Sequence, residues 1–240
     1  MKLPAVSDRA TVLMVNEIFG PTVQGEGPSA GQLAMFVRLY GCSLSCRWCD
    51  TAWTWDAARF DLAGEQHPMT VNAVLQQLRG QMPGLVVITG GEPLLQQDGL
   101  ATLAEGITSA RVAGRVEVET SGTVPPWPAL TAAVTAFNVS PKLAHSGLRR
   151  SQRIRPEVLR QFAASGKAVF KFVACGLEDL DEISEIVTAS GLAPVWVMPE
   201  GCDSATVLTR MRVLADQVIA RGWNLTPRLH VLLWEDQRAR

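Results

Sequence analysis

The sequence predicts an α/β fold in which a parallel sheet is wrapped by helices. Short runs rich in β-branched and aromatic residues recur along the chain, and each run ends in a turn that carries glycine or proline. Between these runs lie segments whose apolar residues are three or four positions apart, as they are on one face of a helix. Strands that alternate with helices favour a parallel sheet, because each crossover helix joins two parallel strands.

The elements follow from these two patterns in chain order. The strand-like runs are residues 33–39, 85–89, 116–119, 137–140, 168–173 and 195–198. Helical spacing is found in three sets of apolar residues: Val71, Val74, Leu75 and Leu78; Leu180, Ile183, Ile186 and Val187; Val207, Met211, Leu214 and Val218. No internal repeat and no linker rich in Pro, Gly and Ser separates two cores. We therefore expect residues 1–240 to form a single domain.

Polar residues gather directly after four of the expected strands. The segments are Thr-Gly-Gly-Glu-Pro at 89–93, Glu-Thr-Ser-Gly at 119–122, Ser-Pro-Lys at 140–142 and Met-Pro-Glu-Gly at 198–201. Each could be an ordinary strand-to-helix turn, since such turns need glycine, proline and capping residues. The carboxyl ends of parallel strands are also where ligands bind in α/β folds. Four such segments together favour a binding site at this edge of the sheet.

Composition and charge restrict the class of protein. The chain has 240 residues, of which 47% are hydrophobic and 19% charged, so it is neither disordered nor collagen-like. Its 22 Lys and Arg against 23 Asp and Glu give a net charge of -1, which provides no global field for nucleic acid or anionic lipid. No apolar run has the ~20 residues of a membrane span, and Pro4, Asp8 and Arg9 interrupt the place of a signal peptide. We expect a cytoplasmic protein without nucleic-acid or membrane partners.

One local cluster of basic residues is an exception to this neutral balance. It contains Arg149, Arg150, Arg153 and Arg155. Nucleic-acid surfaces usually combine basic with aromatic side chains, and no aromatic residue lies among these arginines. A solvated loop and the start of a helix are the favoured interpretation.

Three of the five cysteines form a cluster with the spacing CxxxCxxC. They are Cys42, Cys46 and Cys49, and the other two, Cys175 and Cys202, are far downstream and are interpreted as ordinary thiols. Three neighbouring thiolates can hold zinc or an iron–sulfur cluster. A structural zinc site normally has four protein ligands, and the nearest histidine is His67. An open 4Fe-4S cluster, a zinc site and unliganded buried cysteines all remain possible from spacing alone.

The residues around the cysteines narrow this choice. Trp48 lies in the second gap of the motif, and Gly90-Gly91-Glu92-Pro93 follows about forty residues later at a strand end. In these features the chain resembles the radical S-adenosylmethionine (SAM) superfamily. The resemblance implies a partial or modified (β/α) barrel, shorter than an eightfold one, whose three cysteines hold a 4Fe-4S cluster. It also implies that SAM chelates the open iron and is split into methionine and a 5′-deoxyadenosyl radical, so that no side chain is the catalyst.

Further motifs resemble the 7-carboxy-7-deazaguanine synthase family. They are Asn-Glu-Ile-Phe at 16–19, Val-Gln-Gly-Glu-Gly at 23–27, Cys-Asp-Thr at 49–51, Glu-Thr-Ser-Gly-Thr at 119–123, Val-Ser-Pro-Lys at 139–142 and the segment 229–234. The resemblance spans most of the chain. It implies ring contraction of 6-carboxy-5,6,7,8-tetrahydropterin to 7-carboxy-7-deazaguanine with loss of ammonia, using the cluster, SAM and Mg2+. It further implies a homodimer that receives electrons from a flavodoxin-like reductant.

The resemblance assigns substrate contacts to Val23, Gln24, Gly25, Arg38, Thr89, Glu119 and His230. A guanidinium at position 38 would suit a bidentate contact with the substrate carboxylate. Glu117 and Glu119 share one face of their strand, so alternation alone does not distinguish them, and the resemblance selects Glu119. His230 lies in an apolar segment interpreted as a strand. Lys171 would be costly inside a sheet without a partner, so it either lies opposite a carboxylate or faces solvent.

For SAM, the resemblance indicates Trp48, Cys49, Asp50, Gly91, Ser140, Pro141, Lys142, Met198, Pro199, Glu200 and Gly201. Gly90, Gly91 and Glu92 would form the turn whose backbone meets the SAM amino group. Thr51, directly after the Cys-Asp pair, would bind Mg2+. Without the resemblance, a capping or turn hydroxyl is the simpler interpretation of Thr51.

Two other functions share part of this pattern. An activase that makes a glycyl radical on a partner protein has the same cysteine spacing, but it would be expected to lack the segments at 24–27, 49–51 and 140–142. A zinc-binding interaction module would explain the cysteines without any radical chemistry.

Overall fold

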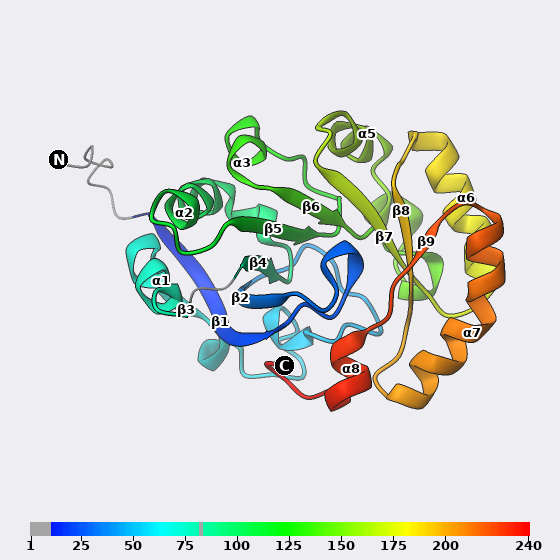
Figure 1. The fold of residues 1–240 in the computed structure, drawn as a ribbon, viewed down its shortest axis with the longest axis horizontal. Helices are drawn as coiled ribbons and strands as arrows, with labels where there is room; N and C mark the ends of the chain where they lie inside the picture. The colour runs from blue at the N-terminus through cyan, green and yellow to red at the C-terminus, as the bar shows by residue number, and fades with distance from the viewer. Residues whose placement is uncertain (1–10, 82–83) are drawn as a thin grey trace.

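The computed structural model describes residues 11–81 and 84–240, which form one nine-stranded sheet with helices on its outer side (Figure 1). The strands are β1 (Val12–Val23), β2 (Leu33–Leu39), β3 (His67–Thr70), β4 (Leu85–Gly90), β5 (Arg115–Thr120), β6 (Ala136–Val139), β7 (Ala168–Ala174), β8 (Val195–Pro199) and β9 (Asn224–Leu225). The helices are α1 (Val71–Leu78), α2 (Gln97–Ser109), α3 (Pro128–Ala133), α4 (Arg150–Arg153), α5 (Pro156–Ala164), α6 (Glu178–Ser190), α7 (Ser204–Ala220) and α8 (Leu229–Trp234).

The sheet order is β3-β1-β2-β4-β5-β6-β7-β8-β9. From β2 to β9 each neighbouring pair is parallel, whereas β1 pairs antiparallel with both β2 and β3. Within the described residues, no pairing joins β9 to β3, so the curved sheet stays open. The fold is therefore a partial (β/α) barrel, as the sequence predicted.

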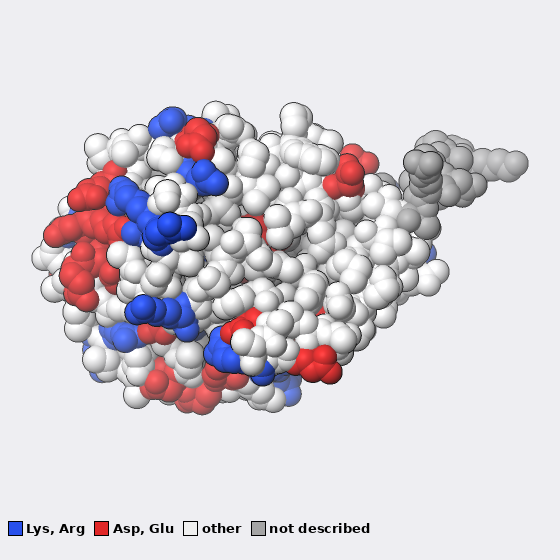
Figure 2. Space-filling view, turned by 180° about the vertical axis from the view of Figure 1, so that it is seen from behind, with Lys and Arg blue, Asp and Glu red and all other residues white. Residues whose placement is uncertain are grey.

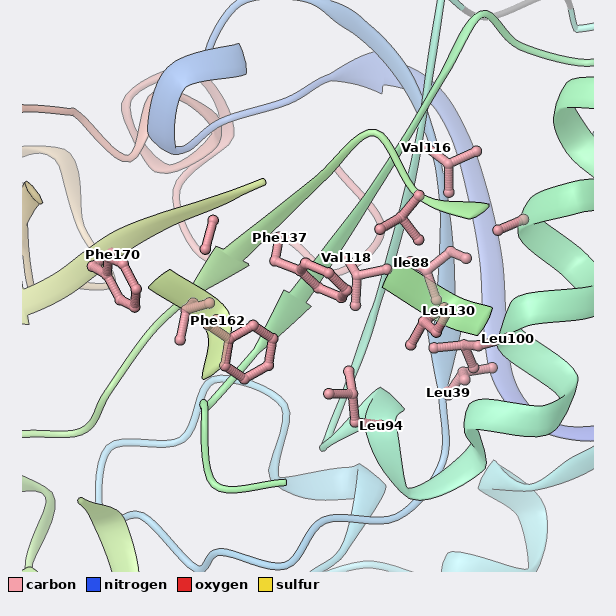
Figure 3. Packing of buried hydrophobic residues seen from close by; sticks show 14 of the residues in the cluster. Leu39, Ile88, Leu94, Leu100, Val116, Val118, Leu130, Phe137, Phe162 and Phe170 are labelled. Carbon is pink, nitrogen blue, oxygen red and sulfur yellow. The ribbon is translucent and has the colours of Figure 1, made fainter. Parts of the chain in front are cut away.

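Alternation along the strands separates an apolar outer face from a polar inner face. Val86 and Ile88 of β4, Val118 of β5 and Phe137 of β6 belong to one large buried cluster under the helices (Figure 3). Phe162 of α5 packs edge to face on Phe137, with ring centroids 5.2 Å apart. Burying each such side chain contributes about 1.5–3 kcal/mol, so this outer layer supplies most of the stability of the sheet.

The inner face carries the residues between these apolar ones. Glu117 and Glu119 of β5, Asn138 of β6 and Lys171 of β7 alternate with buried apolar neighbours. A small apolar group around Phe36, Leu85 and Val87, joined by Phe19, fills the inner side near β2 and β4. The remaining inner surface combines these polar groups with apolar side chains such as Val173 and Met198, so the space enclosed by the open barrel suits a ligand with both polar and apolar parts.

The predicted strands and helices are confirmed, with small changes at their ends. The strands β1, β3 and β9 and the helices α2 and α3 were not expected, and the arginine segment expected to begin a helix leads into α4 and α5. The interpretation of the segment around His230 as a strand is wrong, because residues Leu229–Trp234 form α8. Pro227 precedes this helix, and the Leu232 amide donates to the Arg228 carbonyl, which closes a helical turn. The continuous sheet supports the expectation of a single domain, which stays a prediction.

In the cluster of arginines, Arg149, Arg150 and Arg155 are exposed, as expected, and only Arg153 is buried. Arg150 lies 3.7 Å from both Glu182 and Glu185, and Arg153 is buried with Nη1 2.6 Å from Glu182 Oε1. Arg153 therefore fixes α4 against α6 and is not a surface residue. On the face shown in Figure 2, basic and acidic side chains are interspersed without a broad patch of one sign.

Two sequence-level expectations concern membranes and leader peptides. Among the described residues, no helix is both long and apolar enough to cross a bilayer. Residues 1–10, which carry the argument against a signal peptide, lie outside the described residues.

Candidate active site

A cavity of about 280 Å³ opens at the carboxyl edge of the parallel strands. It is lined by the cysteine loop after β2, by the ends of β4 to β8, by the segment after β1, and by residues at the carboxyl end of the chain. Of the residues predicted to bind substrate, cofactors or Mg2+, those on the wall are Val23, Gln24, Gly25, Arg38, Cys42, Cys46, Trp48, Cys49, Asp50, Thr51, Thr89, Gly91, Glu119, Ser140, Lys142, Met198, Glu200 and His230.

Three predicted SAM contacts lie behind the wall. They are Pro141, Pro199 and Gly201, which are absent from the cavity lining. The carbonyl of Gly201 accepts from Arg228 Nη1 at 2.7 Å, so this residue holds a cavity arginine from outside. The Glu200 carboxylate pairs through Oε2 with Arg210.

The cysteine loop places three thiols at the cavity. Cys42, Cys46 and Cys49 all line it, and the Cys49 amide donates to the Cys46 carbonyl at 3.3 Å in a tight turn. Burial raises the pKa of Cys42 to about 12 and also raises the pKa of Cys46, because a thiolate loses hydration there. A cationic metal centre would offset this cost, since it attracts thiolates.

The spacing of the loop sulfurs differs from that of a closed zinc site. Four thiolates around one zinc lie about 3.8 Å apart, which follows from the Zn–S distance of about 2.3 Å in a tetrahedron. Among the described residues, only His145, Cys175 and Asp179 have three ligand atoms that all lie within 4.8 Å of one another. At least one pair among the sulfurs of Cys42, Cys46 and Cys49 is therefore farther apart than 4.8 Å.

The turn after β4 packs directly on the cysteine loop. A Cβ at Gly91 would lie 2.3 Å from the Gly41 carbonyl oxygen and 2.7 Å from Cys42 Cβ, so only glycine fits. The Glu92 amide donates to the Gly41 carbonyl at 2.8 Å. The buried Glu92 carboxylate accepts from Thr120 Oγ1 at 2.7 Å and from the Ser121 amide at 2.9 Å. Glu92 therefore braces the turn and does not face the cavity.

Trp48 forms part of the wall beside the cysteines. Its ring stacks on His145 with centroids 5.3 Å apart, and Lys142 Nζ lies 5.6 Å from its ring centroid. Lys142 Nζ also donates to Ser140 Oγ at 3.1 Å. The Trp48 indole N–H is buried and has no partner in the described part of the chain. An unpaired buried donor at a cavity is what a ligand acceptor would satisfy.

Cys175, interpreted from the sequence as an ordinary thiol, lies behind Trp48. Its Sγ is 3.5 Å from His145 Nδ1, and His145 Nε2 is 3.0 Å from the Val173 carbonyl oxygen. Burial raises the pKa of Cys175 to about 11, so the group remains a thiol at neutral pH. These contacts fix the His145 ring on which Trp48 stacks.

The structure distinguishes the two glutamates of β5. Glu117 is buried and is paired with Arg115, Ser29 and Asn138. Glu119 faces the cavity, where it accepts from Thr89 Oγ1 at 2.9 Å and from Gln24 Nε2 at 3.1 Å. Only Glu119 can accept hydrogen bonds from a ligand, in agreement with the resemblance.

Four charged residues, Lys171, Glu26, Arg228 and Asp50, form a chain of ion pairs beneath Glu119. Of these, only Lys171 and Asp50 were singled out from the sequence. Lys171 Nζ pairs with Glu26 and lies 3.9 Å from Glu119 Oε1. Arg228 Nε lies 3.3 Å from Glu26 Oε1, and Arg228 also pairs with Asp50. Burial alone would raise the pKa of Glu26, but Lys171 and Arg228 outweigh it and hold that pKa far below its ordinary value. Lys171 thus lies opposite carboxylates, as one sequence interpretation expected.

His230 lies against the segment after β1. A Cβ at Gly25 would lie 2.0 Å from His230 Nδ1, so glycine is required for this approach. The Leu229 amide donates to the Gly25 carbonyl at 2.8 Å. Burial lowers the pKa of His230 despite the nearby Glu26 carboxylate, which favours a neutral ring.

Arg38 lines the cavity and forms an ion pair with Glu17, and both side chains are largely buried. Its Nε is 2.8 Å from Glu17 Oε1, and its guanidinium lies 5.4 Å from the Phe19 ring centroid. Glu17 is shared with Arg238, whose Nε is 2.9 Å from Glu17 Oε2. A ligand carboxylate would compete with Glu17 for Arg38.

Sequence comparison identifies related proteins over nearly the whole chain. Residues 23–127 match a family model described as a 4Fe-4S single cluster domain. The 7-carboxy-7-deazaguanine synthase of Pyrobaculum aerophilum is 38% identical over 229 residues, which cover 94% of this chain and 96% of the relative. The enzyme of the same name from Bacillus subtilis is 32% identical over 249 residues, covering 93% and 97%.

Solved structures show the same architecture. The crystal structure of QueE from Escherichia coli matches with a TM-score of 0.67 and 25% identity, covering 91% of this chain and 95% of that one. Streptococcus suis SuiB bound to precursor peptide SuiA matches with a TM-score of 0.55 at 13% identity, covering 82% and 49%. The second likeness concerns the fold alone.

Proposed function

This chain belongs to the 7-carboxy-7-deazaguanine synthase family, and from that premise we propose a role for each group around the cavity. The protein is a radical SAM enzyme that converts 6-carboxy-5,6,7,8-tetrahydropterin to 7-carboxy-7-deazaguanine with loss of ammonia, using a 4Fe-4S cluster and SAM. The observation that carries the proposed roles is that three cysteine thiols and Glu119 line one cavity.

The cysteine side of the cavity is proposed to hold the cofactors. Cys42, Cys46 and Cys49 would ligate the cluster, and the match of residues 23–127 to a 4Fe-4S single cluster domain supports this role. When bound, the cluster and SAM supply the radical that begins the reaction. Trp48 would lie against SAM and satisfy its buried indole N–H there. The backbone of the turn at Gly91, fixed by Glu92, would face the SAM amino group.

The opposite side is proposed to hold the pterin. Glu119 would accept hydrogen bonds from the amino and ring N–H groups, with Gln24 and Thr89 orienting its two oxygens. Lys171 limits the movement of Glu119, because its ammonium lies 3.9 Å from Oε1. Arg38 at the rim would exchange Glu17 for the substrate carboxylate. Val23, Gly25 and a neutral His230 would complete the wall around the ring.

Thr51 is the proposed protein ligand for Mg2+. Thr51 lines the cavity, and its Oγ1 lies 3.6 Å from Cys49 Sγ. Mg2+ prefers octahedral oxygen coordination and keeps several waters, so one neutral hydroxyl would need the substrate carboxylate and water to complete the shell.

Three wider proposals rest on the family resemblance. The electron donor would be a flavodoxin-like reductant, the chain would act as a homodimer, and the enzyme would work in the cytoplasm. Sedimentation of the purified protein checks the dimer, because a monomer at micromolar concentration would contradict it.

Anaerobic turnover tests the proposed function. Reconstituted protein is incubated with the pterin, SAM, Mg2+ and a chemical reductant, and 7-carboxy-7-deazaguanine is measured by liquid chromatography and mass spectrometry. We expect product and ammonia in equal amounts. Tetrahedral zinc in place of iron and sulfide, or an iron-loaded protein that forms no product, would contradict the assignment.

The two glutamates of β5 provide a matched pair for the substrate site. Glu119→Gln replaces an ionised acceptor at the cavity, so we expect pterin affinity to fall about tenfold to a hundredfold, the equivalent of a charge-assisted hydrogen bond. Glu117→Gln changes the same residue type two positions away, where the side chain is buried and paired with Arg115. This control should lower stability without a specific loss of pterin affinity, measured by equilibrium dialysis.

A further inference from the structure

A hydrogen bond reaches one of the three cysteine sulfurs from a neighbouring aromatic side chain. The indole N–H of Trp55 donates to Cys49 Sγ, with 3.3 Å between Nε1 and Sγ. An indole nitrogen is only a donor, so the direction of this bond is fixed by chemistry. Trp55 lines the cavity, and neither the motif spacing nor the composition pointed to it.

The backbone holds Trp55 in place for this contact. Trp55 ends the short 3-10 helix Ala52–Thr54, and its amide donates to the Ala52 carbonyl at 3.1 Å. Thr54 is fully buried, and its carbonyl accepts from the Gly41 amide at 3.0 Å. Gly41 precedes Cys42, so the segment that carries Trp55 is tied to the start of the loop whose sulfur it reaches. The position of the indole is therefore part of the folded loop.

A donor at a ligating sulfur changes how easily the metal centre is reduced. Reduction adds negative charge, which is shared between the irons and the sulfurs. An N–H that points at a sulfur stabilises the reduced state more than the oxidised state, and hydrogen bonds around a metal centre tune its potential in this way. Outside bulk water the effect is larger, because the local dielectric constant is lower.

We propose that Trp55 raises the reduction potential of the cluster through its N–H bond to Cys49 Sγ. The proposal rests on the proposed role of Cys49 as a cluster ligand. Trp55 acts through that sulfur and so is a positioning residue, not a catalytic one. The higher potential would allow the electron donor to reduce the cluster more easily.

The chain offers a matched control two residues earlier. Trp53 also lines the cavity, but its indole N–H donates to Asn16 Oδ1 at 3.1 Å and reaches no sulfur. Trp53→Phe and Trp55→Phe therefore make the same chemical change on the same loop. Only the second removes a hydrogen bond to a proposed ligand.

The test is a redox titration of the reconstituted protein, followed by electron paramagnetic resonance. For Trp55→Phe we expect the midpoint potential to fall by the equivalent of about a tenfold change in the one-electron reduction equilibrium, or about 59 mV. Trp53→Phe should leave it within a twofold change. Equal potentials in Trp55→Phe and the unsubstituted protein, or an equal fall in Trp53→Phe, would overturn the proposal.

A second substitution decides the matter if Trp55→Phe fails to load its cluster. Replacing Trp55 by β-(3-benzothienyl)alanine keeps the bicyclic shape and puts sulfur where the N–H was. A lower potential in this variant supports the proposal, and an unchanged one overturns it. Iron and sulfide analysis of the unsubstituted protein distinguishes a failure of the proposed function from a failure of the proposed role of Trp55. Absence of a cluster there would count against the proposed function, whereas a cluster with a potential indifferent to position 55 would count against Trp55 alone.

Discussion

Two sets of arginine–carboxylate pairs border the same cavity and differ in burial. On the floor, Glu26 pairs with Lys171 and Arg228, and both cations have side chains less than a tenth exposed. At the rim, Arg38 and Arg238 share Glu17. The Arg238 side chain is 43% exposed, whereas those of Arg38 and Glu17 are 14% and 15% exposed, close to the 15% of Glu26. Water therefore reaches the outer end of the rim set at Arg238, but not the cations of the floor.

The difference in burial implies a difference in role. Removing one partner from a buried pair leaves part of a buried charge uncompensated, so we expect the floor to be rigid. The exposed pair at Arg238 contributes little, because water competes with it, so Glu17 can release that arginine at small cost. We therefore expect the floor to set the shape of the site, and the rim to exchange Glu17 for a substrate carboxylate at Arg38, as proposed above.

The largest expected effect is on the floor. Lys171→Met removes the cation closest to Glu26 and leaves that carboxylate with Arg228 as its remaining partner, so we expect the free energy of unfolding to fall by up to about 3–5 kcal/mol. Urea denaturation followed by circular dichroism measures it. The double variant Lys171→Met with Glu26→Gln should recover part of the loss. A loss below about 1 kcal/mol would show that the floor is no more rigid than the rim.

The second prediction concerns acid. Because the folded state holds the pKa of Glu26 below its unfolded value of about 4.3, its contribution is complete above about pH 5 and is lost as pH falls below that value. Near pH 3, Glu26→Gln should reduce the slope of unfolding free energy against pH by up to about 1.4 kcal/mol per pH unit. Parallel curves for the two proteins would mean that Glu26 is not held ionised.

The third prediction tests the exchange at the rim. Arg38→Lys keeps the charge but loses the planar fork, so we expect KM for the pterin to rise about tenfold with little change in kcat. Steady-state kinetics measure both parameters. A pterin without its carboxylate is the control substrate, since it should bind both proteins equally. An unchanged KM for the carboxylated substrate would remove Arg38 from the site.

The smallest effect is expected at the outermost pair. Arg238 contacts Glu17 and Glu65 and lies 4.7 Å from the Trp53 ring centroid. Because its side chain is partly exposed, Arg238→Ala should cost less than about 1 kcal/mol of unfolding free energy. A thermal melt at low and high salt measures this. A larger loss of unfolding free energy that persists at high salt would show that this contact stabilises the fold as the buried ion pairs of the floor do.

The elements that depend on a local pattern of residues were predicted from the sequence. They are the parallel strands β2 and β4 to β8, the helices α1, α6 and α7, and the cysteine loop, which follow from periodicity or spacing. The strand β1 was not predicted, because Asn16, Glu17 and the Gly20-Pro21 pair interrupt its apolar pattern. Its strand conformation depends on pairing with β2 and β3, and a local sequence pattern does not indicate such pairing.

Contacts between distant residues were the part that sequence reasoning missed. Arg228 and Asp50 are far apart in the chain, and nothing near either residue indicates the other. Alternation placed Glu117 and Glu119 on one face, but their different partners separate their roles. Trp53 and Trp55 likewise look equivalent in sequence, and only the geometry shows that one reaches a sulfur.

Glu92 joins three loops through its hydrogen bonds. Its own turn follows β4, its amide donates to the Gly41 carbonyl before Cys42, and its carboxylate accepts from Thr120 and Ser121 at the end of β5. Glu119 is the residue of β5 directly before Thr120. We therefore expect a displacement of the loop after β5 to reach the cysteine loop through Glu92. Substitutions at Thr120 or Ser121, neither of which is a proposed cluster ligand, should accordingly disturb cluster assembly before they disturb the sheet.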